Sequence, residues 1–471
     1  MTIIQILIIV IFTLLFAILK RGRDSFLLIA SVLVMFWLQP ALPIRGFDFW
    51  IPIATLIITI FTWLITTDNK LNRKNIFTLV IIASIILLIN LTRYFSFAQI
   101  FTPSRPPQIE ITLIIFLIFG LIFFLLMKYN ASFLTFGLIL LLSIFLILKI
   151  PAWTIELSSL LRALNNQSLT NVSALDIRWL GFSYVAFRLI HTIRDKQAGR
   201  LPSVDLGEYI TYVIFFPAFT AGPIDRIERF IKDLRQPFEG LNQEKFFEAG
   251  QRLLIGLFKK FVIADTLALI ALNDTNATQI QSTGWMWILV YAYAFQIYFD
   301  FSGYTDIALG IAKFIGINLP ENFSSPYLKP NLTQFWNNWH MTLTQWFRSY
   351  FFNPVTRWLR SWQKPMSMPM MILLTQVATM VLIGFWHGVT WNFTIWGLWH
   401  GLGLFIHNRW NDLTKAKAAE WANTPFKQNV LNISGIIFTF HFVAIGWIFF
   451  ALSSPVTSWN MILKLFGVVS P

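Results

Sequence analysis

The stretch Gly384–Gly401, GFWHGVTWNFTIWGLWHG, contains the tripeptide Trp-His-Gly twice. Its residues are mostly apolar or aromatic, and the segment Gly388–Asn392 predicts a break between two helices. A buried histidine needs partners for its ring nitrogens, which makes His387 and His400 unusual in this setting. In one straight helix these two histidines would lie about 140° apart around the axis. The repeated tripeptide alone therefore does not predict a paired metal site.

The rest of the chain has the same apolar character. Of its 471 residues, 56% are hydrophobic and 12% are charged, about half the charged fraction of a soluble domain. This composition predicts an integral membrane protein built of helices. The absence of cysteine excludes disulfides, thiolate nucleophiles and acyl-cysteine intermediates. The net charge of +14 comes mainly from short loops between apolar runs. Basic residues in such loops determine how a protein is oriented in the membrane, so the charge does not indicate nucleic-acid binding.

The first 150 residues contain long apolar runs, each of a length that can cross a bilayer. No positive segment precedes the first run and no small-residue cleavage site follows it, which predicts a retained helix rather than a signal peptide. We therefore predict that residues 1–150 form N-terminal transmembrane helices. The runs are Thr2–Leu19, Phe26–Ile44, Phe49–Thr66, Ile76–Thr92, Ile111–Met127 and Phe133–Ile150.

The basic residues between these runs predict the orientation. With the N-terminus outside, ten lysines and arginines fall on the cytoplasmic side and four fall outside. This distribution predicts a multi-pass protein of the inner or plasma membrane with an extracytoplasmic N-terminus. The cytoplasmic groups are Lys20–Arg23, Lys70–Lys74, Lys128 and Arg194–Arg200, and the outer residues are Arg45, Arg93, Arg105 and Arg162.

From about Asp176 the hydrophobic segments become shorter and are interrupted by proline, glycine and charge. Non-helical backbone within the membrane is tolerated only where other protein groups or a water-filled cavity supply hydrogen bonds to its N–H and C=O groups. Residues 151–471 therefore predict a funnel-like core with re-entrant pieces, within one all-α membrane domain of about 11–14 transmembrane or re-entrant helices. The segments are Tyr209–Ile224, Gly284–Tyr298, Gly303–Ile317, Met370–Phe385 and Trp391–Ile406, with a last helix near Val430–Leu452.

Two further clusters combine polar and aromatic residues. Asp300 and Asp306 lie next to apolar runs; an acid there is a functional candidate, but it also suits a helix cap or a loop anchor. In Gln334–Tyr350 the aromatic residues follow helical spacing, which predicts a helix near the membrane interface. His340 lies at the edge of that stripe, and the helical spacing alone favours no functional role for it.

A buried neutral histidine suits proton transfer, because its unperturbed pKa is about 6.5. If it accepts a proton from a hydroxyl, that hydroxyl can attack an acyl ester or thioester without any nucleophile of the enzyme. The sequence contains no Gly-x-Ser-x-Gly elbow, P-loop or dinucleotide-binding fingerprint. Carboxylates near the two Trp-His-Gly histidines are also lacking, so we predict no metal site.

The chain resembles the membrane-bound O-acyltransferase (MBOAT) superfamily, and in particular its bacterial branch with the teichoic-acid D-alanyltransferase and alginate O-acetyltransferase membrane subunits. The matching motifs occur in the family's order over about Asp176–Ala451, and together they are highly specific. They are Gly181-Phe-Ser-Tyr, Phe215-Phe-Pro, Ala221-Gly-Pro-Ile-Asp-Arg226, Asp300–Asp306, Pro320-Glu-Asn-Phe, Phe335–Tyr350 and Gly384–Gly401.

The resemblance implies two catalytic residues. His387 matches the family's active-site histidine and would be the general base, and His340 matches the second active-site position. The remaining histidines, His191, His407 and His441, are given structural roles. The residues expected to line the substrate tunnel are Trp336, Asn337, Asp300, Ser302, Arg348, Trp386, Asn392 and His400.

Two positions depart from the branch's pattern. Ser349 follows Arg348 where the branch usually has an acid, and Ala451 stands where an arginine is common. The Gly-Pro-Ile-Asp-Arg stretch leans toward D-alanyl transfer, whereas the length and the N-terminal helices lean toward the alginate side. The acyl group and the acceptor therefore stay open.

The resemblance implies an O-acyltransferase that moves acetyl or D-alanyl from a cytoplasmic thioester toward a hydroxyl of an extracytoplasmic glycopolymer. The donor would be acyl-CoA or a phosphopantetheinyl acyl carrier protein, with no tightly bound cofactor. Further expected partners are an extracytoplasmic SGNH-type acyltransferase, an envelope polysaccharide or teichoic-acid-like acceptor, and membrane lipid, but no nucleic acid. A flippase for a lipid-linked sugar fits the broken helices almost as well, although no internal symmetry supports it. A non-catalytic scaffold is the third possibility.

Overall fold

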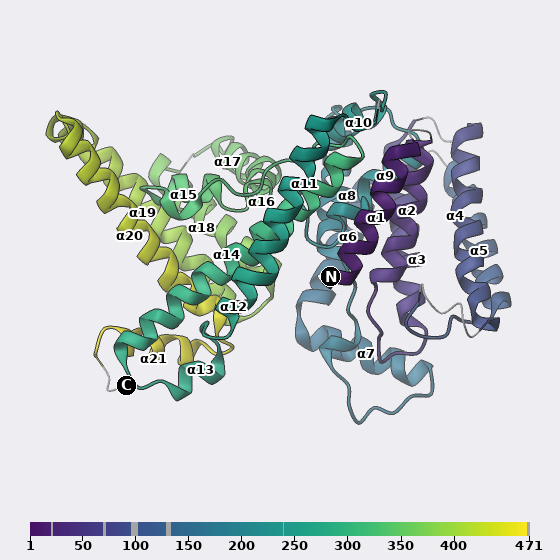
Figure 1. Cartoon of the computed structure of the whole chain (residues 1–471), viewed down its shortest axis with the longest axis horizontal. Helices are drawn as coiled ribbons and strands as arrows, with labels where there is room; N and C mark the ends of the chain where they lie inside the picture. The colour runs from purple at the N-terminus through teal and green to yellow at the C-terminus, as the bar shows by residue number, and fades with distance from the viewer. Residues whose placement is uncertain are drawn as a thin grey trace. The chain divides into compact units, whose positions relative to one another are not determined.

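The computed structural model describes residues 1–19, 22–68, 72–95, 102–128, 133–238, 240–364 and 366–468. Over these ranges the chain forms helices joined by loops, with no β-strand (Figure 1). The predicted all-α fold is therefore confirmed. Three basic residues used to predict the orientation, Lys20, Arg21 and Lys70, lie outside the described residues, and the orientation stays a prediction.

The chain forms two compact units. Unit 1 comprises residues 1–253 and 308–319, and unit 2 comprises residues 254–307 and 320–471. The division into N-terminal helices over residues 1–150 and a catalytic core over 151–471 stays a prediction.

Unit 1 contains all six expected N-terminal helices. The second one ends earlier than predicted, at Leu38 rather than Ile44, because Pro40 follows and forces Gln39 into an extended conformation. The helices of this unit are α1 (Ile3–Leu19), α2 (Arg23–Leu38), α3 (Phe47–Thr66), α4 (Arg73–Leu91), α5 (Ile109–Lys128), α6 (Leu134–Lys149), α7 (Pro151–Leu164), α8 (Phe182–Gln197), α9 (Leu206–Val213), α10 (Ile227–Arg235) and most of α11 (Gln243–Leu257).

Several described helices are suited to crossing a membrane. Five are long and apolar enough, namely α3, α4, α5, α18 (Met368–His387) and α20 (Pro425–Ala451), and the pair α6–α7 is bent by 93°. Pro151 at the start of α7 accounts for a helix boundary there. Other apolar helices are shorter, so the membrane-protein class that the composition predicts is supported by the helices themselves.

Unit 2 contains four of the motifs that carry the family resemblance, namely Asp300–Asp306, Pro320-Glu-Asn-Phe, Phe335–Tyr350 and Gly384–Gly401. It holds α12 (Asp265–Ala268), α13 (Asp274–Gln279), most of α14 (Thr283–Phe314), α15 (Leu332–Asn338), α16 (Met341–Phe347), α17 (Asn353–Arg360), α18, α19 (Trp391–Trp421), α20 and α21 (Pro455–Leu465), with π-helices η5 (Phe258–Ala264) and η7 (Arg348–Phe352). The last of these helices, α21, follows the segment that we expected to be the final one.

The sequence predicted Gly284–Tyr298 and Gly303–Ile317 as two separate segments, and this prediction is wrong. One 32-residue helix, α14, contains the first segment and the second as far as Phe314. Gly303 does not break this helix; its missing side chain allows close packing on η5, since an added Cβ would lie 2.8 Å from the backbone nitrogen of Lys260. The glycine serves a helix contact rather than an interruption.

The break predicted at Gly388–Asn392 is confirmed. Helix α18 ends at His387 and α19 begins at Trp391 after a short turn, and the Thr390 hydroxyl caps the backbone N–H of Phe393. The two helices pack so closely that an added Cβ at Gly397 would lie 2.6 Å from the Cα of Val381. Small residues of this kind let helix backbones approach each other in membranes. Helices α19 and α20 also run side by side (Figure 1).

Candidate active site

His340 lies at a sharp turn rather than inside a helix. The prediction of one helix over Gln334–Tyr350 is wrong, because α15 ends at Asn338 and α16 begins at Met341. His340 itself adopts φ 42° and ψ 54°, in the left-handed region. Such a conformation is uncommon for residues other than glycine and costs about 1–3 kcal/mol. The surrounding structure must therefore hold it.

The loop that contains Asn322 supplies these contacts. The Asn322 carbonyl accepts from the N–H of Met341 at 3.0 Å, and its Oδ1 accepts from the backbone and hydroxyl of Thr342 at 3.2 and 2.6 Å. On the other side of the turn, the N–H of Ser324 donates to the carbonyl of Asn338 at 3.1 Å. Asn322 of the Pro-Glu-Asn-Phe motif and Ser324, just after the motif, thus hold the two sides of the His340 turn.

The ring of His340 is buried, with 3% of the residue exposed. It meets Phe301 and Trp386 edge-on, at centroid distances of 4.7 and 5.8 Å. Neither ring nitrogen has a hydrogen-bond partner among the described residues. Burial lowers the pKa of His340 to about 3, so its imidazole is neutral at physiological pH. A buried polar group left without a partner is a candidate for binding a ligand.

His387 is the last residue of α18 and is surrounded by aromatic rings. The Trp386 centroid lies 4.3 Å away and the Phe450 centroid 4.6 Å away. Phe393 and Trp396, both on α19, lie at 5.7 and 5.9 Å. Three helices, α18, α19 and α20, therefore contribute to its surroundings.

His400 is completely buried on α19. Its ring lies 5.1 Å from those of both Trp336 and Trp396, and neither of its nitrogens has a partner among the residues that the structure describes. On the α20 side it lies against Gly446, where an added Cβ would be 2.8 Å from Nε2.

Two tryptophans connect the three histidines. Trp386 contacts both His340 and His387, and Trp396 contacts both His387 and His400. We call these five residues the histidine–tryptophan cluster. The turn between α18 and α19 brings together two histidines that a single straight helix would have separated.

A small pocket adjoins the cluster. It has a volume of about 160 Å³, and three expected tunnel residues, Trp336, Asn337 and Arg348, line it. Arg348 donates to the Oδ1 of Asn337 at 2.6 Å. In the described part of the chain, the buried Nε1 of Trp336 and Oε1 of Gln376 have no hydrogen-bond partner. Because Trp336 also contacts His400, the pocket and the cluster share a wall.

Asp300 and Asp306 lie in the middle of α14, so neither caps a helix. Asp306 is buried and its carboxylate accepts from Lys259 at 2.7 Å, while the more exposed Asp300 pairs with Lys260. Both lysines come from the π-helix η5. Between the acids, Ser302 is 3% exposed and its hydroxyl has no partner among the described residues. The carboxylates therefore join η5 to α14.

The hydrogen bonds of the Asn392 side chain hold neighbouring helices together. Its side-chain amide donates to the carbonyl of Leu452 and to the hydroxyl of Ser458, which fastens the start of α19 to the junction of α20 and α21. Its Oδ1 is buried without a partner among the described residues. Asn392 does not line the pocket beside Trp336.

Sequence reasoning missed three contributors to the site. Asn322 shapes the His340 turn, Trp396 joins two histidines, and Lys259 neutralises a buried acid. Asn322 and Trp396 both fall within motifs that carry the family resemblance, but their periodicity alone gives them no special role. Lys259 is signalled only by its position in an otherwise apolar segment.

One group of potential metal ligands occurs among the described residues, and it lies in unit 1. Donor atoms of His191, Asp195 and Glu228 lie within 4.8 Å of one another. The Nε2 of His191 accepts from the backbone N–H of Ile227 at 3.3 Å, and Asp195 pairs with Arg200 at 3.0 Å. These protein partners account for the buried members of the group.

The model of the MBOAT, membrane-bound O-acyltransferase family matches residues 95–454. The chain belongs to this family. The matched range contains all of the histidine–tryptophan cluster and the pocket beside it.

The chain is similar to proteins that are named for acyl transfer to teichoic acid, alginate or peptidoglycan. The chain is 31% identical over 286 residues to a teichoic acid D-alanyltransferase of Streptococcus thermophilus, covering 58% of this chain and 68% of the relative. It is 35% identical over 274 residues to a probable alginate O-acetylase of Pseudomonas syringae, covering 58% and 48%. A peptidoglycan O-acetyltransferase of Helicobacter pylori is 31% identical over 262 residues, covering 55% and 47%. The match thus spans about half of the length of the last two relatives.

Proposed function

We propose that this chain is a membrane O-acyltransferase that passes a small acyl group toward a hydroxyl of an envelope glycopolymer. The observation that carries the proposal is the histidine–tryptophan cluster, in which the buried His340 and the partly buried His387 both contact Trp386. Family membership supports the reaction type, and the names of the relatives support acetyl or D-alanyl as the group and an envelope polymer as the acceptor.

In the proposed reaction His387 acts as the general base. It takes the proton of the acceptor hydroxyl while the hydroxyl oxygen attacks the carbonyl carbon of a thioester. The tetrahedral intermediate then collapses, the carbon–sulfur bond breaks, and the thiolate leaves and takes up a proton. An ester and a thiol are the products, and no enzyme nucleophile is needed, in agreement with a chain that has no cysteine.

His340 is proposed to donate a hydrogen bond to the oxygen of the reacting carbonyl. A neutral imidazole can do this with its N–H, and the buried ring of His340 has two nitrogens without partners among the described residues. A donor held in place before the reaction stabilises the developing negative charge and avoids reorganisation. The strained left-handed turn, clamped by Asn322, supplies that preorganisation.

The donor and the sides of the membrane are part of the same proposal. The donor is acyl-CoA or a phosphopantetheinyl acyl carrier protein on the cytoplasmic side. The acceptor hydroxyl belongs to a glycopolymer outside, or to an extracytoplasmic SGNH-type acyltransferase that hands the group on.

The test uses a deletion strain of the host that carries the wild-type chain or His387→Ala, at matched membrane levels. Envelope glycans are treated with mild base and the released acids are quantified. The proposal predicts that wild type restores an ester and His387→Ala does not. His407→Ala makes the same substitution at a histidine given a structural role, and this matched control should restore the ester. Equal restoration by His387→Ala would remove His387 as the base.

A further inference from the structure

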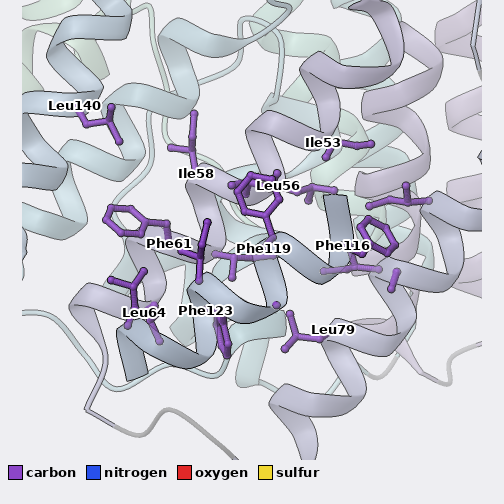
Figure 2. A pocket seen from close by; sticks show the side chains of 18 of the residues that line it. Ile53, Leu56, Ile58, Phe61, Leu64, Leu79, Phe116, Phe119, Phe123 and Leu140 are labelled. Carbon is purple, nitrogen blue, oxygen red and sulfur yellow. The ribbon is translucent and has the colours of Figure 1, made fainter. Parts of the chain in front are cut away.

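Helices α3, α4, α5 and α6 surround an apolar cavity of about 460 Å³ in unit 1. We call it the α3–α5 slot. Figure 2 shows Ile53 and Phe116 at one end, and Leu64 and Phe123 near the other. Every residue that lines the slot is hydrophobic or glycine. Water has no polar partner there, so an apolar occupant is favoured.

The slot lies among helices that are suited to the hydrocarbon of a membrane. Three of its four walls, α3, α4 and α5, are long and apolar enough to span a bilayer. Helix α5 packs on α4, but only 6% of its apolar window is buried. The apolar medium around α5 is therefore lipid, and lipid chains have direct access to the slot.

The length of the slot matches one leaflet. Ile53 and Leu64 are eleven residues apart on α3, which corresponds to about 17 Å along the helix axis. The hydrocarbon of a bilayer is about 30 Å thick, so the slot is as long as one lipid chain in one leaflet. Spread over that length, the cavity is too narrow for another helix of about 10–12 Å in diameter.

Positive charge lies beyond one end of the slot. Leu79 lines the slot on α4, and Arg73 and Lys74 occupy the first turn of the same helix. Both side chains are exposed, and Lys74 is 82% exposed even though it lies 3.7 Å from Asp205. Exposed lysine and arginine at the end of a spanning helix attract the phosphates of anionic lipids.

We propose that the α3–α5 slot binds one acyl chain of an anionic phospholipid, with the headgroup phosphate near Arg73 and Lys74. This binding site is separate from the acyl-transfer reaction and does not depend on it. The bound chain would fill the space between α5 and the other three helices, and it would stabilise the position of α5.

The structure offers a substitution that fills the slot. Gly120 lines the slot on α5, and a Cβ added there meets no atom within 4 Å. Gly120→Phe therefore places a ring in the slot without a backbone clash. Leu121→Phe is the matched control, because Leu121 is next in sequence, is 61% exposed and does not line the slot.

The experiment reconstitutes the full chain in vesicles that contain phosphatidylglycerol with a photoreactive diazirine in one acyl chain. After irradiation, cross-linked peptides are located by mass spectrometry. We expect wild type to be labelled on the slot faces of α3 and α5, and Gly120→Phe to lose that labelling by about tenfold, because an overfilled site excludes the chain. Leu121→Phe should be labelled like wild type.

Two results would overturn the inference. One is labelling spread evenly over all apolar helices and unchanged in Gly120→Phe. The other is an equal loss in Gly120→Phe and Leu121→Phe. Gly120→Ala adds only a methyl group and controls for misfolding caused by the loss of the glycine. This variant should retain the labelling. A parallel experiment with photoreactive phosphatidylcholine tests the headgroup, and labelling as strong as with phosphatidylglycerol would overturn the role of Arg73 and Lys74.

Discussion

Trp386 contacts both His340 and His387: its ring centroid lies 5.8 Å from that of His340 and 4.3 Å from that of His387. The two histidines come from different parts of the chain, one from the turn before α16 and the other from the end of α18. A single indole therefore contacts both histidines of the proposed reaction.

Replacing this indole tests that arrangement. Trp386→Leu removes the ring that both histidines contact, so we expect the rate of ester formation to fall by about 100-fold, the usual effect of misplacing reacting groups by about 1 Å. Trp386→Phe keeps a ring and should lose less. Ester content of the envelope at equal membrane levels is the measurement. Full activity of Trp386→Leu would mean that the indole does not position the histidines.

The clamp on the His340 turn gives the second prediction. Asn322→Ala removes the acceptor for the backbone and hydroxyl of Thr342, so the left-handed turn loses two hydrogen bonds worth about 1 kcal/mol each. We expect lower acyl transfer together with a lower unfolding temperature. Thr342→Ser keeps the hydroxyl donor and is the matched control. Unchanged activity in Asn322→Ala would show that the turn does not need this clamp.

Gly446 gives the third prediction, which concerns His400. An alanine at this position places its Cβ 2.8 Å from the Nε2 of His400, so the imidazole must move. If His400 contacts substrate, Gly446→Ala should lower acyl transfer by about tenfold with little loss of folded protein. Gly250→Ala, whose added methyl meets nothing within 4 Å, is the control. Wild-type activity in Gly446→Ala would argue against a role of His400.

The two ion pairs between η5 and α14 differ in burial and should differ in strength. Lys259→Met leaves the buried Asp306 without its cation and should cost about 3 kcal/mol, whereas Lys260→Met should cost about 1 kcal/mol or less because Asp300 is half-exposed. Thermal unfolding in detergent measures both. In the double variant Lys259→Met, Asp306→Leu, much of the stability should return. Equal losses for the two lysine variants would contradict this ranking.

Much of the fold could be predicted from local sequence. The apolar runs of the first 150 residues became helices, and the Gly388–Asn392 break became the turn between α18 and α19. These features depend on the length of an apolar run and on the position of glycine, and both are properties of the local sequence. The family motifs likewise identified the histidines that unit 2 brings together.

The errors came from partners distant in sequence. Asp300 and Asp306 each suited a helix cap or a loop anchor, yet both lie inside α14, where they pair with Lys260 and Lys259, more than 35 residues earlier. The helix predicted over Gln334–Tyr350 is broken at His340, where Asn322 accepts hydrogen bonds from the backbone of Met341 and Thr342. Periodicity reports on neighbours along one helix, so it does not report such long-range contacts.

The most direct test of the central claim is imidazole rescue of His387→Gly. Membrane vesicles from the deletion strain that carries this variant would receive a labelled acyl thioester, and ester formation on the endogenous acceptor would be followed with and without free imidazole. If His387 is the general base, the variant should be slower than wild type by about 100-fold or more, and imidazole should restore part of the rate. A variant that keeps the wild-type rate would contradict the account.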